Sequence, residues 1–286
     1  MNKKILKSSN KIIKKYSKNF YFTSFFIIKK YSKYLKIIYF ICRKLDEIAD
    51  KNYLNSKKKS LKRLTVILKQ IKNNSKQKLD KLSKLIKNLK KNKSINLNSF
   101  IDLINCLIKD IKYPANIKNE KELIYYCYGV AGTIGNIVLP FIKCSITNTI
   151  KAINLGIFLQ MINIARDVLE DAFKGRRYLP ACWVNNINAK EIIYLSNIPI
   201  NKKHKLISSA IIRLLFLSEY YYIKGIKNIY KVNYINRIII TIISSIYYKI
   251  NINISNTKYY WIYKRIYISL YYKIFITLKT IIKSIC

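Results

Sequence analysis

The segment Leu155–Pro180, with the sequence LGIFLQMINIARDVLEDAFKGRRYLP, constrains the fold more than any other part of the chain. On a helix that turns by about 100° per residue, Asn163, Asp167 and Asp171 fall on one stripe. A row of amide and carboxylate groups is a poor core face, because buried carboxylates need partners. It is a good wall for Mg²⁺, a hard cation that prefers oxygen ligands. We therefore expect a helix that presents a metal site and continues until Pro180 ends it.

A second stripe of the same kind occurs earlier in the chain. In the helical pattern that follows Ser17, one face carries four polar side chains: Tyr39, Arg43, Asp46 and Asp50. Alone, this D-x-x-x-D motif would indicate a solvated helix end, but six of the thirteen acidic residues lie in these two short windows. The pairing favours a function for both motifs. Lysine and arginine residues directly after the second motif indicate an anionic ligand bridged by metal.

The chain is strongly basic, with 55 Lys and Arg against 13 Asp and Glu in 286 residues and a formal net charge of +42. Such a surplus often marks a nucleic-acid-binding protein. Here lysine, isoleucine, asparagine and tyrosine are enriched throughout, whereas a nucleic-acid binder gathers basic residues on one face with aromatic platforms. We therefore interpret the surplus as a drift in residue usage and expect no specific nucleic-acid partner.

Cysteine and histidine usage indicates neither a zinc site nor a disulfide framework. The six cysteines show no C-x-x-C spacing, and the single histidine, His204, has no cysteine nearby. This usage fits a reducing compartment. We therefore expect a cytoplasmic location.

The sequence predicts peripheral, not integral, membrane contact. Lys3, Lys4 and Lys7 near the N-terminus are not followed by an apolar run of signal-peptide length. The best apolar run, Ile238–Ile246, is shorter than the roughly 18–20 residues of a membrane span. A basic exterior would instead hold the protein at an anionic membrane surface, and high salt would release it.

A helical period runs through most of the chain, and no segment shows strands alternating with helices. The fold class that we expect is all-α, as a single domain over residues 1–286 with residues 1–15 disordered or frayed. Small residues between Asn119 and Pro140 would let another helix or a ligand approach closely, or would bend the helix. Further helices are expected at these places: one or two surface helices across 52–98, and helices over 101–111, 187–198, 200–230, 232–252 and 256–283.

Three segments together resemble the squalene/phytoene synthase family. They are CRKLDEIAD at Cys42–Asp50, YCYGVAGTIG at Tyr126–Gly135 and LQMINIARDVLEDAFKGRRYLPACW at Leu159–Trp183. The last is most similar to the bacterial phytoene synthases. A weaker resemblance over 213–268 places a tyrosine at 247 and an arginine at 265.

The resemblance implies an isoprenoid synthase-type helical bundle with a central cavity and the head-to-head condensation of two prenyl diphosphates. It implies that Mg²⁺ is held by five residues: Asp46, Asp50, Asn163, Asp167 and Asp171. The four aspartates and Tyr247, whose ring can stabilise a carbocation, are the expected catalytic residues. The expected substrate-binding residues are Ser17, Arg43, Tyr126, Val130, Gly135, Gln160, Asn163, Tyr178 and Arg265.

The expected reaction joins two geranylgeranyl diphosphates to phytoene through a cyclopropylcarbinyl diphosphate, a step of carotenoid biosynthesis. The expected cofactor is Mg²⁺, with Mn²⁺ as a second candidate, and phytoene formation needs no NADPH. One alternative is squalene or dehydrosqualene synthesis from farnesyl diphosphate. Another is a non-catalytic relative that acts in assembly, although such a protein has no physical need for all four aspartates.

Overall fold

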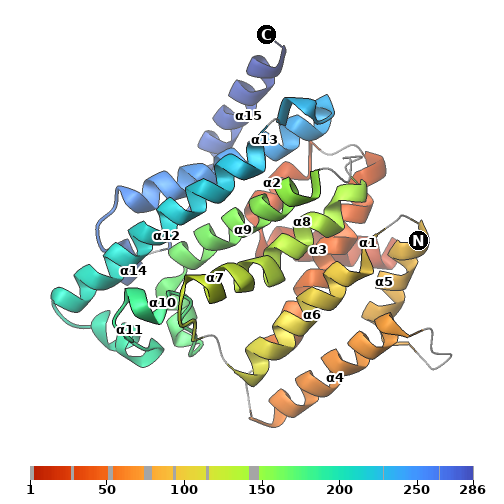
Figure 1. Cartoon of the computed structure of the whole chain (residues 1–286). Coiled ribbons are helices and arrows are strands. Elements are labelled where there is room, and N and C mark those ends of the chain that lie inside the picture. The colour runs from red at the N-terminus through yellow and green to blue at the C-terminus, as the bar shows by residue number, and fades with distance from the viewer. Residues whose placement is uncertain are drawn as a thin grey trace.

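A computed structural model shows an all-helical protein (Figure 1). It describes residues 3–26, 29–50, 54–73, 79–92, 95–113, 116–141, 148–227, 229–263 and 265–285. Within these ranges no strand forms, and the one β-type contact is an isolated bridge between Asn116 and Arg177. The all-α prediction is confirmed.

The first half of the chain forms the helices on the right and lower side of Figure 1. Their bounds are α1 Lys3–Tyr16, α2 Lys18–Thr23, α3 Lys29–Ala49, α4 Leu54–Lys72, α5 Lys81–Asn92, α6 Leu97–Lys112, α7 Glu120–Cys127 and α8 Thr133–Val138. A π-helical turn, Tyr128–Gly132, joins α7 to α8, and a 3₁₀ turn, Leu139–Phe141, follows α8.

The second half forms the long helices on the left and upper side. Their bounds are α9 Thr149–Arg166, α10 Val168–Phe173, α11 Ala189–Leu195, α12 Lys202–Ile226, α13 Tyr234–Ser255, α14 Tyr260–Tyr263 and α15 Leu270–Ile285. Short 3₁₀ turns lie at Ala181–Trp183 and Ile229–Lys231. The expected single helix over 256–283 is therefore wrong, because α14 and α15 are separate.

Helix α1 runs through most of the N-terminal segment for which the sequence predicts disorder or fraying. Ser9 and Ile13, one turn apart, are buried, and Ile5 and Leu6 pack against the core of the first half. The helix lies on α3. A short apolar stripe is thus enough to hold a lysine-rich segment on the protein.

Two clusters of buried apolar side chains form the core. One joins α3–α6 with α8 through residues such as Ile41, Leu64 and Phe100. The other joins α7 and α9–α15 through residues such as Phe158 and Ile246. Helices α4 and α5, expected as surface helices, contribute several fully buried side chains to the first cluster.

The segment Leu155–Pro180 is not one helix. α9 ends at Arg166, and Asp167 leaves the helical region with φ −111° and ψ 20°. The Asp167 amide still donates to the Asn163 carbonyl at 3.0 Å, and the Asp171 amide donates to the Asp167 carbonyl at 2.9 Å. The stripe therefore survives the break. α10 ends at Phe173, and Gly175 with φ +73° turns the chain, so Pro180 does not end the helix.

Small residues bring α8 and the π-helical turn against α9. A Cβ on Gly135 would lie 2.2 Å from the Ala152 carbonyl oxygen, and a Cβ on Gly156 would lie 2.3 Å from the Ala131 carbonyl oxygen. These two contacts run in opposite chain directions, so α8 and α9 are antiparallel. The expected close approach of another helix is therefore present, and the adjoining segment Tyr128–Gly132 is π-helical.

Three helical stretches within the described residues are long and apolar enough to cross a membrane, judged by length and composition alone: Glu120–Phe141, Lys202–Ile226 and Tyr234–Ser255. This corrects the expectation that no segment reaches that length. Their apolar composition is compatible with membrane association, and all three also supply side chains to the core.

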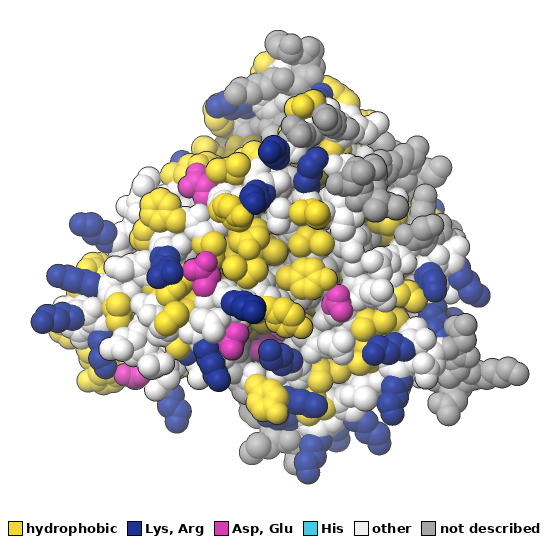
Figure 2. Space-filling model, viewed as in Figure 1, with side chains coloured by type: hydrophobic (Ala, Val, Ile, Leu, Met, Phe, Trp, Pro, Cys, Tyr) yellow, Lys and Arg dark blue, Asp and Glu magenta, His cyan; other side chains and the backbone are white. Residues whose placement is uncertain are grey.

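The basic residues are spread over the visible surface. Figure 2 shows Lys and Arg side chains scattered around this face, hydrophobic side chains gathered near its middle and few acidic ones. No single basic face stands out in this view.

Candidate active site

A cavity of about 1240 Å³ lies between the two halves of the chain. Its wall combines residues of α1–α3 and α6 with residues of α7–α9 and α13. Every site residue expected from the sequence lines it: Ser17, Arg43, Asp46, Asp50, Tyr126, Val130, Gly135, Gln160, Asn163, Asp167, Asp171, Tyr178, Tyr247 and Arg265.

The two acidic motifs meet at this cavity from different elements. Asp46 and Asp50 lie at the C-terminal end of α3, whereas Asp167 and Asp171 lie at the junction of α9 and α10. Burial, reinforced by the neighbouring carboxylates Asp50 and Asp167 respectively, raises the pKa of Asp46 and of Asp171 to about 7. Each motif therefore holds two carboxyl groups close together in a partly buried site.

Two arginines bind Asp167. Arg166 donates from Nε and NH2 to its two carboxylate oxygens, both at 2.8 Å. Arg265, from the segment before α15, lies 3.0 Å from the same carboxylate and 3.0 Å from Glu170. Arg265 thus reaches the acidic motif itself, and Arg166 is a cavity residue that the motif analysis missed.

Arg176 connects the first motif to α6. Its guanidinium donates to Asp50 at 2.9 Å and lies 3.6 Å from the buried Asp110. Asp110 was also missed by the sequence analysis, because an isolated acidic residue on a predicted helix gives no signal of its own.

The adjacent Arg177 has a structural role. It donates to the carbonyls of Ile117 and Leu179 and to the Asn116 side chain, and it does not line the cavity. Burial lowers its pKa. It therefore holds the turn after α10 against residues 116–118, which fixes where Arg176 points.

Arg43 is placed to bind an anion. Its guanidinium stacks over the Tyr16 ring at 4.1 Å, and Glu47 lies 3.7 Å from its Nε. That Nε is buried and lacks a hydrogen-bond acceptor among the described residues. The Arg43 side chain is nevertheless 29% exposed and lines the cavity, so an anionic ligand there can pair with its guanidinium.

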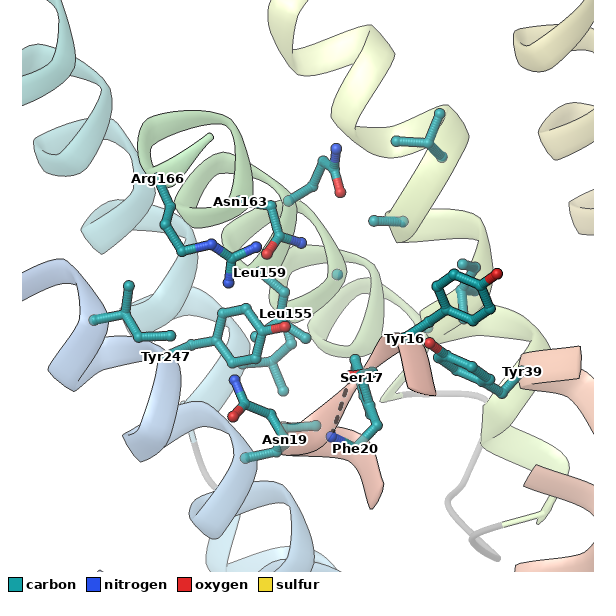
Figure 3. A pocket seen from close by; sticks show the side chains of 18 of the residues that line it. Tyr16, Ser17, Asn19, Phe20, Tyr39, Leu155, Leu159, Asn163, Arg166 and Tyr247 are labelled. Carbon is teal, nitrogen blue, oxygen red and sulfur yellow. Dashed lines mark hydrogen bonds between the residues drawn. The ribbon is translucent and has the colours of Figure 1, made fainter. Parts of the chain in front are cut away.

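Tyrosines and the start of α2 form another part of the wall, seen in Figure 3. Ser17 caps α2 by accepting the Phe20 amide at 3.3 Å, and its side chain also interacts with Tyr39. Asn19 interacts in the same way with Tyr247, which comes from α13 and shares this space with Arg166 and Asn163. Burial raises the pKa of Tyr247, which keeps its ring neutral.

Tyr126 and Tyr178 pair with each other inside the cavity. The Tyr126 hydroxyl donates to the Tyr178 hydroxyl at 2.9 Å, and the rings stack with centroids 4.6 Å apart. The pair joins α7 to the turn after α10.

Away from the acidic motifs the cavity wall is mainly apolar, although Asn148 and Lys151 near the start of α9 also line it. Residues of α9 line it from Asn148, just before the helix, to Asp167 just after it, a length of about 28 Å at 1.5 Å per residue. The opposite walls are mainly aliphatic: Val130, Ala131, Ile134, Val138, Leu139, Ile240, Ile243 and Ile250. A polar, charged end and a long apolar channel suit an amphiphilic ligand with an anionic head.

The donor set fits a divalent cation such as Mg²⁺. No group of three or more His, Cys, Asp or Glu side chains forms a ready-made cluster among the residues described. Mg²⁺ does not require one, since it is commonly bound by one or two carboxylates, with water and substrate phosphates completing its shell. Asp50 and Asp167 lie close enough to raise the pKa of Asp46 and of Asp171 respectively, after the larger effect of burial, and a cation between the carboxylates would offset that repulsion.

This arrangement defines the protein as an isoprenoid synthase-type helical bundle. The chain matches the sequence profile of the squalene/phytoene synthase family over residues 13–272, and it belongs to that family.

Among curated relatives, it is 36% identical over 102 residues to 15-cis-phytoene synthase of Enterobacter agglomerans, an alignment that covers 35% of this chain and 33% of that protein. It is 40% identical over 88 residues to a chloroplastic phytoene synthase of Narcissus pseudonarcissus, covering 28% and 21% of the two chains. The matched region thus spans a third or less of these relatives.

The solved structures that it resembles share the fold over nearly the whole chain. A dehydrosqualene synthase in complex with ligand superposes with a TM-score of 0.79 at 22% identity, covering 98% of this chain and 96% of that chain. Squalene synthase HpnC from Alicyclobacillus acidocaldarius superposes with a TM-score of 0.71 at 14% identity, covering 89% and 94%.

Proposed function

We propose that this protein is a prenyltransferase that condenses two geranylgeranyl diphosphates head to head to phytoene, with Mg²⁺ as its cofactor. The observation that carries the proposal is the pair of acidic motifs at one end of a long apolar cavity. The family membership and the relatives named as phytoene synthases support it. The cavity exceeds the range of about 300–1,000 Å³ usual for small-molecule pockets, as a site for two lipid chains requires.

The reaction needs a site that stabilises a departing diphosphate without quenching the carbocation left behind. Arg43, which lines the cavity and is partly exposed, is suited to bind phosphate oxygens. Arg265 and Arg166 hold Asp167 in place, so the carboxylate keeps one orientation before substrate enters.

The apolar walls exclude water, which would trap the cation as an alcohol. Tyr247 presents its ring to the same space, and the face of a neutral aromatic ring attracts a nearby cation by about 1–2 kcal/mol. The cyclopropylcarbinyl diphosphate formed first would ionise in the same cavity and rearrange to the linear product.

Mg²⁺, or Mn²⁺ as a second candidate, would be held by Asp46, Asp50, Asp167 and Asp171 with Asn163, and would neutralise the charge that develops on the diphosphate. The conversion to phytoene consumes no reductant, so we propose no NADPH requirement. The described cysteines are unpaired, in keeping with a cytoplasmic enzyme.

The alternative substrate is farnesyl diphosphate, which would give a squalene-type product. The superposition on a dehydrosqualene synthase concerns the fold alone. The length of the cavity along α9 supports the longer substrate. A non-catalytic role is disfavoured because all four aspartates and the arginines that orient them are retained at the cavity.

Calorimetric binding of an unreactive thio-analogue of geranylgeranyl diphosphate tests the proposal without turnover. We expect binding of the analogue to require Mg²⁺. The variants Asp46→Asn and Asp171→Asn should each weaken this binding at least tenfold. The matched control is Asp80→Asn, which changes an aspartate outside the cavity that caps α5 and pairs with Arg63. Equal affinity with and without metal would overturn the metal part of the proposal.

A further inference from the structure

The outward face of α15 is apolar, although nothing in the described chain covers it. Its inward side packs on α13 through residues such as Ile276 and Thr277, which are buried. On the rest of the helix, a stripe of exposed side chains occupies about 140° of the circumference. The stripe consists of Leu270, Tyr271, Ile274, Phe275, Leu278 and Ile282. Tyr271 is 87% exposed and the other five are 44–62% exposed.

An exposed apolar face of this kind is expected to be covered by another molecule. A helix that is apolar on both sides is normally buried in a protein or lies against lipid. α15 extends past α13 at the top of Figure 1, with the C-terminus at its outer end. Its exposed face is therefore accessible to a large partner.

The charge of this part of the chain indicates the charge of the partner. After Glu219 the sequence contains nine lysines, two arginines and no acidic residue. A groove of about 710 Å³ between α13 and α15 is lined by three of these cations, Arg237, Lys249 and Lys279, and by no carboxylate among the residues described.

The groove combines its cations with hydroxyl and apolar groups. Thr241, Ser245 and Thr280 lie beside the cations, and Ile252 and Phe275 complete the wall. The groove lies on one side of α13. The main cavity lies on the other side, where Ile240, Ile243 and Tyr247 line it. It is therefore a separate site that suits an acidic headgroup with an apolar tail.

We propose that the exposed stripe of α15 and the adjoining α13–α15 groove dock the protein on an anionic phospholipid bilayer. The stripe would enter the interface as an amphipathic surface helix does, and the groove cations would bind acidic headgroups. A second copy of this chain is a poor occupant, because a two-fold contact would bring two equally basic and acid-free surfaces together.

Docking would also explain how substrates reach the main cavity. Leu270 and Lys273 of α15 line that cavity, so the stripe and the cavity wall belong to one helix. This step rests on the proposed function, in which the substrates are amphiphiles and the product is a lipid. The docking itself is tested without substrate, so its failure would leave the proposed chemistry standing.

The test is co-sedimentation of the full chain with vesicles of phosphatidylcholine alone or mixed with phosphatidylglycerol, at low and at molar salt. We expect binding to the anionic vesicles that salt weakens but does not abolish. The variant Tyr271→Ser/Ile274→Ser/Leu278→Ser, which leaves both cavities' lining unchanged, should reduce the partition coefficient at least about tenfold, because its side chains no longer transfer apolar area. Replacing Phe216, Tyr220 and Ile223, an exposed stripe on α12, by serine is the matched control and should change it less than about twofold.

A variant that removes the groove cations tests the groove independently of the apolar stripe. Arg237→Gln/Lys249→Gln/Lys279→Gln should lower binding to anionic vesicles about tenfold or more and flatten its salt dependence. Lys58→Gln/Lys59→Gln/Lys62→Gln on α4 removes the same charge elsewhere and should retain most of the binding. Circular dichroism confirms that each variant is folded.

Three results would overturn the proposal. They are failure of the wild-type chain to bind either vesicle, undiminished binding by the α15 variant, and a dimer in light scattering that the α15 variant converts to a monomer. The last result would identify a second copy of the chain as the occupant.

Discussion

At the scale of single residues, the buried carboxyl groups of the cavity link stability to pH. The pKa of Asp46 and of Asp171 is about 7 in the folded chain, raised mainly by burial, against about 3.9 in an unfolded chain. Between these values the folded state holds protons that the unfolded state releases. The free energy of unfolding of the metal-free protein should therefore fall as pH rises from about 4 to about 7.

Asp46→Asn tests this linkage. The variant lacks the ionisable group, so its melting temperature should fall less than that of the wild type between pH 5 and pH 8. Adding Mg²⁺ at pH 8 should stabilise the wild type more than the variant. A thermal melt series in metal-free buffer measures both effects, and parallel melting curves for the two proteins would contradict the linkage.

Asp167 carries the strongest single-residue prediction for activity. Asp167→Asn removes one of the carboxylates that we propose to hold Mg²⁺ and weakens the contacts with Arg166 and Arg265, so turnover should fall by orders of magnitude while the fold is kept. Asp80→Asn, which can still cap α5, is the control. Initial rates at limiting Mg²⁺ decide the point, and undiminished turnover by Asp167→Asn would exclude a metal role there.

At the scale of elements, the close approach of α8 to α9 sets the cavity wall. Gly135→Ala would place a methyl group against a backbone carbonyl that cannot move aside, so we expect a loss of about 1–3 kcal/mol in unfolding free energy. At Gly225 an added Cβ meets mainly the flexible Leu155 side chain, so Gly225→Ala should cost less. Denaturant unfolding compares the two, and equal losses would show that the backbone contact is not special.

The far end of the channel should limit substrate length. Since α8 and α9 are antiparallel, Val138 lies at the end of the cavity away from Asp167. Val138→Phe should therefore lower turnover of the C20 diphosphate more than that of the C15 diphosphate. Val66→Phe, on the exposed side of α4, is the control. An equal effect on both substrates would show that Val138 does not limit chain length.

The elements also show how much the sequence could predict. The i, i+4 spacing of each acidic pair is a local property, so both motifs and their helices were predictable, as was the all-α class. The break at Asp167 was not, because ordinary helix-forming residues surround it. The contact of Arg176 with Asp50 was also not predictable, since these residues are 126 positions apart and only the fold brings them together. The apolar pattern of α1 was too short to distinguish a docked helix from a frayed end.

At the scale of the whole molecule, two halves with separate cores enclose one cavity, and each half brings one acidic motif to it. The basic surplus does not enter the proposed chemistry. In the last quarter of the chain it coincides with an uncovered apolar helix, the surface that we propose to dock on an anionic membrane.

Identification of the hydrocarbon product decides whether this cavity couples two prenyl diphosphates. Purified protein is incubated with geranylgeranyl diphosphate or farnesyl diphosphate, with Mg²⁺ or EDTA and with or without NADPH, and the hydrocarbon products are identified by mass. We predict phytoene from the C20 substrate, formed with Mg²⁺, lost with EDTA and unaffected by NADPH. A product from the C15 substrate alone would assign the squalene-type reaction instead, and no hydrocarbon from either substrate would contradict the account of this cavity as a prenyl-coupling site.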